Sequence, residues 1–100
     1  MTLEQFRESL HGDRPPAELN PALAGLWWDA RGDWESAHNS AQQDEGPAGA
    51  WVHAYLHRKE GDDPNAGYWY RRAAKTPASG SLDDEWEAIT TALLGGTPPE

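Results

Sequence analysis

WVHAYLHRKEGDDPNAGYWYRRAA, residues 51–74, is the stretch that decides the fold of this 100-residue chain. Its first half predicts a helix, and Gly61-Asp62 predicts a short turn before a second helix that begins near Pro64. Apolar side chains surround much of the first helix, a pattern typical of a helix that packs on more than one side. The stretch therefore predicts a central helical hairpin.

The rest of the chain predicts four further helices and no strand. Most of them begin at a capping residue or a proline and end near a glycine. The six predicted helices cover residues 2–11, 21–30, 34–43, 48–59, 64–74 and 82–94. We therefore expect residues 1–100 to form a single all-α domain, an antiparallel helical array in which residues 95–100 are a tail.

Composition limits the possible partners. The chain has 8 basic and 17 acidic residues and a net charge of −9, which disfavours nucleic acid because phosphate binding needs clustered Lys and Arg. It has no cysteine, which excludes disulfides and thiolate metal sites and fits a reducing compartment. No segment is a signal peptide or approaches the roughly 20 apolar residues of a membrane span. We therefore expect a cytoplasmic protein that binds neither nucleic acid nor membranes.

The central hairpin repeats an earlier part of the chain, so that residues 20–45 correspond to residues 47–75. Gly61 follows Gly32 by 29 residues (61 − 32), and Ala66 follows Ala37 by the same interval. Small residues let two helix backbones approach closely, while aromatic side chains fill the grooves beside them. Such units stack on each other because neither can bury its apolar face alone.

The second helix of this hairpin carries a resemblance to a known family. Residues 62–74, DDPNAGYWYRRAA, resemble the second helix of Sel-like repeats, whose pattern is D-x-x-K-A-x-x-W-Y-x-x-A-A. Asn65 replaces the usual lysine, and His53 and His57 replace a Leu and a Tyr of the family's first helix. The matching residues are Asp62, Ala66, Trp69, Tyr70, Ala73 and Ala74.

Sel-like repeats belong to the tetratricopeptide superfamily, and the segment after Gly32 is similar to the turn of an ordinary tetratricopeptide repeat. The resemblance implies helix-turn-helix repeats capped by the helices at residues 2–11 and 82–94. It also implies a role in binding a protein or peptide along the first helix of each repeat. On this basis we expect a binding surface made of Asp29, Trp51, Tyr55, Arg58 and Arg72.

The spacing of these residues supports the expected surface. Trp51, Tyr55 and Arg58 lie at i, i+4 and i+7 of one helix, and an aromatic pair followed by an arginine is a typical anchor for a peptide or a small acidic ligand. Tyr and Trp suit a core equally well, however. The alternative is that Trp51 and Tyr55 are buried beneath the first or the last helix.

Three histidines form a second candidate site. His53 and His57 are four residues apart on one helix face, the correct spacing for two metal ligands. His38 can approach them if its helix packs antiparallel to theirs, and Asp29 and Glu60 are possible oxygen ligands. The alternative is that these histidines are half-buried polar groups, each hydrogen-bonded to a neighbour.

Nothing in the chain predicts an enzyme. Ser36 and Ser40 share a helix with His38, but the sequence has no strained nucleophile turn, no Gly-rich oxyanion loop and no phosphate-cradling loop. We therefore expect no catalytic residues and assign no cofactor. A protein- or peptide-binding module is the first prediction, and a divalent-metal- or small-molecule-binding protein that uses His38, His53 and His57 is the alternative.

Overall fold

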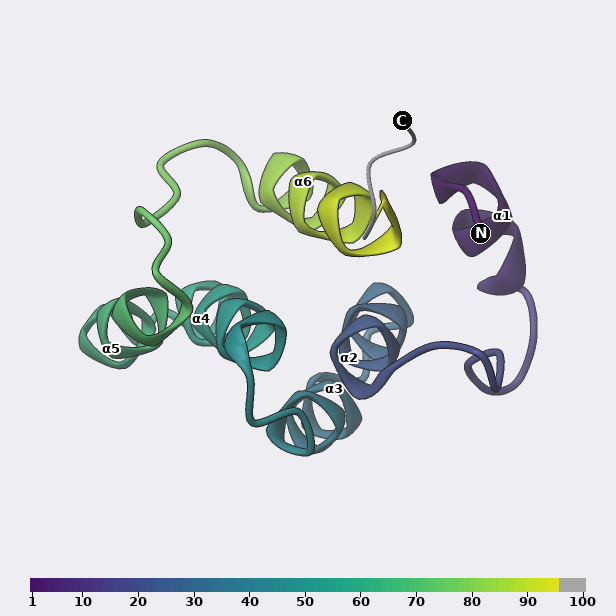
Figure 1. Ribbon diagram of the computed structural model, residues 1–100, viewed down its shortest axis with the longest axis horizontal. Coiled ribbons are helices and arrows are strands. Elements are labelled where there is room, and N and C mark those ends of the chain that lie inside the picture. The colour runs from purple at the N-terminus through teal and green to yellow at the C-terminus, as the bar shows by residue number, and fades with distance from the viewer. Residues whose placement is uncertain (96–100) are drawn as a thin grey trace.

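A computed structural model describes residues 1–95 and shows an all-helical protein (Figure 1). Its helices, in chain order, are α1 (Leu3–Ser9), α2 (Pro21–Ala30), α3 (Trp34–Gln42), α4 (Pro47–Glu60), α5 (Asp63–Ala73) and α6 (Leu82–Gly95). No strand occurs within residues 1–95, so the predicted fold class, all-α with about six helices, is confirmed. The predicted tail lies outside the described residues except for Gly95, which ends α6.

The helix starts follow the capping chemistry of the sequence. Thr2 and Gln5 form a reciprocal capping box at α1, and the side chain of Asn20 accepts a hydrogen bond from the amide of Leu23 at α2. The prediction for the end of α1 was two residues too long. The chain turns after Ser9, and the carbonyl of Leu10 accepts a hydrogen bond from Arg31 (2.8 Å) instead of a helical amide.

The α2–α3 and α4–α5 hairpins turn in the same way. Gly32 and Gly61 both adopt left-handed backbone angles, with φ of 82° and 89°, a conformation that favours glycine. In each turn the aspartate that follows caps the second helix: Asp33 accepts from the amide of Ser36 and Asp62 from that of Asn65. The two turns therefore share one geometry at an interval of 29 residues (61 − 32).

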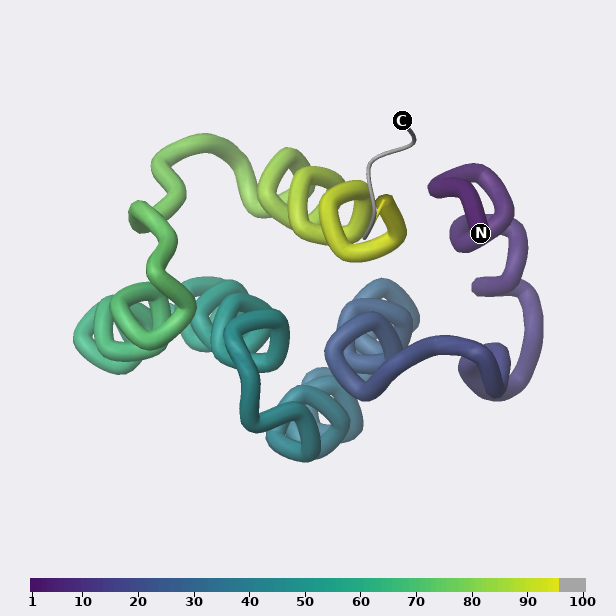
Figure 2. The backbone as a smooth tube through the Cα atoms, in the orientation of Figure 1, coloured from purple at the N-terminus to yellow at the C-terminus, as the bar shows by residue number. Residues whose placement is uncertain are grey.

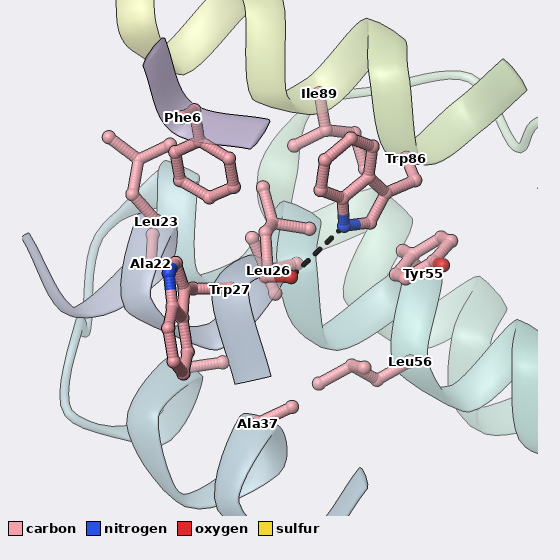
Figure 3. Close-up of a cluster of buried hydrophobic side chains, with 12 residues drawn as sticks. Phe6, Ala22, Leu23, Leu26, Trp27, Ala37, Tyr55, Leu56, Trp86 and Ile89 are labelled. Atoms are coloured by element: carbon pink, nitrogen blue, oxygen red, sulfur yellow. Dashed lines mark hydrogen bonds between the residues drawn. The ribbon is translucent and has the colours of Figure 1, made fainter. Parts of the chain in front are cut away.

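The two hairpins lie side by side, and α6 covers them. Helix α3 packs against α4, while α6 lies across α2 and α4 and also contacts α1 (Figures 1 and 2). The main core lies beneath α6, where Trp27 and Leu26 of α2 are fully buried. The indole of Trp86 on α6 donates to the backbone carbonyl of Leu26 (3.0 Å; Figure 3), which fixes α6 in place.

Two buried carboxylates join the helices around α4. Asp29 accepts hydrogen bonds from the Tyr55 hydroxyl (2.8 Å) and from Lys59 (2.9 Å). Glu85 of α6 accepts from Arg58 (2.9 Å) and from the hydroxyl of Tyr70. Each carboxylate thus has a tyrosine and a cation as partners, which offsets the cost of its burial.

The sequence predicts no membrane-spanning segment, and the lengths and compositions of the helices test this prediction. Within residues 1–95, no helix combines enough length with enough apolar character to cross a bilayer.

Candidate metal centre

The three histidines predicted as metal ligands lie together between α3 and α4. His38 projects from α3, and His53 and His57 project from successive turns of α4. Each offers a ring nitrogen, and the three nitrogens lie within 4.8 Å of one another. Around one zinc ion, by comparison, two ligand nitrogens lie about 3.3 Å apart. Side-chain rotations that shorten these separations would therefore be needed to bring all three onto a single ion.

A glycine makes the close approach of α3 and α4 possible. A Cβ atom at Gly49, in the first turn of α4, would lie 2.0 Å from the backbone oxygen of Asp44 and 2.9 Å from that of Ala41. Only glycine fits this contact, and Ala41 keeps the α3 surface small beside it. The short connection between the helices then holds His38 against His53.

His53 is the unusual member of the cluster. It is only 4% exposed, and among residues 1–95 neither of its ring nitrogens has a hydrogen-bond partner. Buried polar side chains are nearly always hydrogen-bonded, because an unpaired one loses its hydration without compensation. The expectation that each histidine is a bonded polar group therefore fails for His53.

His57 already has the environment of a metal ligand. Its Nδ1 lies 3.1 Å from Oε1 of Glu60, and because a carboxylate can only accept, Nδ1–H is the donor. The proton on Nδ1 leaves Nε2 with its lone pair free for a metal ion. Carboxylates often orient ligating histidines in this way. Glu60 and Asp62 also form a second group with His57 whose ligand atoms lie within 4.8 Å of one another.

Aromatic rings enclose the cluster on two sides. Trp34 stacks on His38, with centroids 5.0 Å apart, and the ring of Trp69 meets His53 edge-on at 4.1 Å. His38 and His53 are themselves stacked, 17° from parallel. Because imidazole lone pairs lie in the plane of the ring, one ring must turn before both can bind one ion. His53 can do so without breaking a hydrogen bond.

Burial and mutual repulsion keep two of the rings uncharged at neutral pH. Burial, followed by the proximity of His38, His57 and Arg72, lowers the pKa of His53 to about 4. Burial and His57 also lower the pKa of His38, against an opposing effect of Glu60. Metal ions bind the neutral imidazole, so neither ligand needs to lose a proton near pH 7.

The residues predicted as a peptide-binding surface do not form one exposed patch. Tyr55 and Asp29 are 2% and 4% exposed and bond to each other. Arg58 pairs with the buried Glu85 of α6, and the ammonium of Lys75 lies 4.2 Å from the ring centre of Trp51. Of the five, only Arg72 is exposed. For Tyr55, the alternative of burial beneath the last helix is correct.

The metal site in the structure differs from the predicted one in its surrounding residues. Trp34, Trp69 and Asp62 lie around the histidines, and none of them was predicted as a residue of this site. Asp29, suggested as an oxygen ligand, is instead held by Tyr55 and Lys59. Trp34 lies four residues before His38, a helical spacing that predicts contact between the two rings.

Comparison with known proteins gives no relatives. No protein-family model matches the chain, no curated protein is significantly similar to it, and no solved structure matches its fold.

Proposed function

We propose that this protein binds a divalent transition-metal ion through His38, His53 and His57. The observation that carries the proposal is His53, a buried imidazole with no hydrogen-bond partner among the described residues, placed beside two other histidines. A metal ion would supply the missing partner and would use all three rings at once. A buried histidine with neither ring nitrogen bonded is uncommon in folded proteins, which favours a role for this ring beyond packing.

The ligand chemistry indicates which ions fit. Imidazole nitrogens suit Zn²⁺, Ni²⁺, Cu²⁺ and Fe²⁺, whereas Mg²⁺ and Ca²⁺ prefer sets of oxygen ligands. Zinc has no strong geometric preference and accepts three protein ligands with a fourth position left open. We therefore expect Zn²⁺ to bind and Mg²⁺ to have no effect.

The family resemblance is a second, separate proposal. We infer that the two hairpins are degenerate repeats of the tetratricopeptide and Sel-like kind, supported by the residue pattern at 62–74 and by the equal turns at Gly32 and Gly61. A role in binding another protein stays a prediction of that resemblance. The metal proposal does not depend on it.

A thermal melt tests the metal proposal. The chelator-treated protein is melted alone, with Zn²⁺ and with Mg²⁺, and the series is repeated on His53→Ala/His57→Ala. His11→Ala is the matched control, because His11 is exposed and lies outside the cluster. A ligand at 100 times its Kd stabilises the folded state by about 2.7 kcal/mol, which raises the Tm of a domain of this size by about 10–20 °C.

The outcomes are distinct. We expect Zn²⁺ to raise the Tm of the wild type and of His11→Ala but not that of the double variant. Equilibrium dialysis should then recover one zinc per chain from the first two proteins only. A wild-type Tm that is indifferent to Zn²⁺, together with no retained ion, would refute the proposal.

A further inference from the structure

A pocket of about 330 Å³ opens beside the histidine cluster. His53 is the residue that the cluster and the pocket share. The pocket is also lined by Trp69 and Arg72 of α5 and by Asp44 and Glu45 of the connection between α3 and α4. A ligand in this pocket would therefore contact the ring that we propose to bind the metal.

Three histidines leave the coordination of the ion incomplete. Within residues 1–95, no carboxylate joins all three ring nitrogens within 4.8 Å of one another. Glu60 is committed to the other nitrogen of His57, at 3.1 Å. Zinc sites with three protein ligands keep a fourth position for water or an added molecule. The fourth ligand must then come from outside the histidine cluster.

The proposed ion and the nearby Arg72 together favour an anion at that position. The Arg72 guanidinium lies 5.1 Å from the ring centre of Trp69, and Trp69 contacts His53 at 4.1 Å. Arg72 also donates to the Tyr68 hydroxyl (3.2 Å), which fixes its position on α5. A dication beside this guanidinium would be repelled by it. An anion placed between the two charges removes that repulsion.

The same pocket limits the charge and shape of the anion. A carboxylate has two oxygens, so that one can accept a charge-assisted hydrogen bond from the Arg72 guanidinium while the other binds the metal ion. Asp44 and Glu45 also line the pocket and repel any anion, and because this repulsion grows with the charge of the ligand it disfavours phosphate more than a monocarboxylate. Asp44 Oδ1 already accepts from the amide of Gly46 (2.8 Å).

We infer that the metal-loaded site takes a small monocarboxylate as its fourth ligand, with one oxygen on the metal ion and the other on Arg72. This inference rests on the proposed function, because it requires the ion to be bound. The pocket would then bind a small organic acid, and Arg72 would position that acid.

Cobalt substitution tests the inference, because the visible absorption of Co²⁺ changes when its ligands change. The Co²⁺-loaded protein is titrated with acetate and, separately, with inorganic phosphate. Arg72→Gln is the test variant. Arg71→Gln is its matched control, since Arg71 is the adjacent exposed arginine of α5 and does not line the pocket. Asp44→Asn and Glu45→Gln test whether either side chain is the fourth ligand.

We expect acetate to change the spectrum saturably, phosphate to bind more weakly, and Arg72→Gln to weaken acetate about tenfold while Arg71→Gln does not. The inference would be overturned if acetate did not change the Co²⁺ spectrum. It would also be overturned if acetate changed the spectrum only in Asp44→Asn or Glu45→Gln, because that side chain would then be the fourth ligand in the wild type. Either result would leave the metal proposal standing. Equal acetate affinity in both arginine variants, or tighter phosphate binding, would also overturn the inference. Failure to retain Co²⁺ at all would overturn both.

Discussion

His38 and His53 stack face to face across two helices, with ring centroids 4.6 Å apart and planes 17° from parallel. Two protonated imidazoles would repel each other at this distance, so the arrangement disfavours protonation of both rings at once. The stack therefore links the charge state of the cluster to the packing of α3 against α4.

Replacing His53 with leucine should stabilise the metal-free protein. The substitution removes two buried nitrogens that have no partner and fills the space with apolar atoms. An unsatisfied buried polar group costs about 1–3 kcal/mol, so we expect a gain in unfolding free energy of about 1 kcal/mol after strain from the change of shape. Urea denaturation of both proteins in the presence of a chelator measures this difference in unfolding free energy. A loss of similar size would mean that the nitrogens of His53 have partners, such as bound water.

Acid should destabilise the metal-free protein before its carboxylates titrate. The pKa of His53 falls from 6.5 in the unfolded chain to about 4 in the folded protein, and that of His38 is lowered too. Between these two pKa values the unfolded chain binds more protons than the folded protein. The free energy of unfolding is therefore highest above pH 6.5 and decreases as the pH falls toward 4. The groups that face His53 are His38, His57 and Arg72. Urea denaturation at pH 7.5, 6 and 5 should show the loss, and His53→Leu should reduce it.

Breaking the Glu85 network should destabilise the fold strongly. Glu85→Ala leaves Arg58 and the Tyr70 hydroxyl without their acceptor, and breaking a buried ion pair costs about 3–5 kcal/mol. Glu87→Ala is the control, because its ion pair with Arg7 is about half exposed and contributes at most about 1 kcal/mol. Chemical denaturation measures the loss of unfolding free energy in each variant. Similar losses would show that Glu85 is solvated in the native protein.

Gly49→Ala should be poorly tolerated. The added Cβ would lie 2.0 Å from the backbone oxygen of Asp44 in the preceding connection and 2.9 Å from that of Ala41 in α3, so α4 must move away from both, at a cost of about 1–3 kcal/mol or more. Gly67→Ala on α5 is the matched control: its nearest neighbour would be an Arg71 nitrogen at 3.6 Å. Because alanine favours helix over glycine, that control should gain up to about 1 kcal/mol. The Tm of each variant is compared with that of the wild type. Equal changes in Tm for Gly49→Ala and Gly67→Ala would contradict the close contact at Gly49.

The helices were predictable because their signals are local. The capping residue Asn20, the prolines at the first helical turns and the glycines after the last ones lie within a few residues of the boundaries that they set. The histidine cluster was predictable for a related reason. His53 and His57 are one helical turn apart, and a short connection makes α3 and α4 antiparallel neighbours, which brings His38 alongside.

The burial of Tyr55 and Asp29 was harder to predict because it depends on distant parts of the chain. Both lie beneath α6, whose position is fixed by contacts such as the indole of Trp86 on the Leu26 carbonyl, 60 residues away in sequence. An i, i+4, i+7 pattern shows that side chains share a face but not which helix covers it. The pairing of Arg58 with Glu85 likewise depends on where α6 docks.

The location of the histidines has a consequence for how the protein opens. His38 belongs to the first hairpin, whereas His53 and His57 belong to the second. Two helical hairpins packed side by side can open separately, with local free energies below that of global unfolding. An ion held by all three rings would cross-link the hairpins noncovalently. Amide hydrogen exchange in α3 and in α4 would then slow together on metal binding, as one cooperative unit.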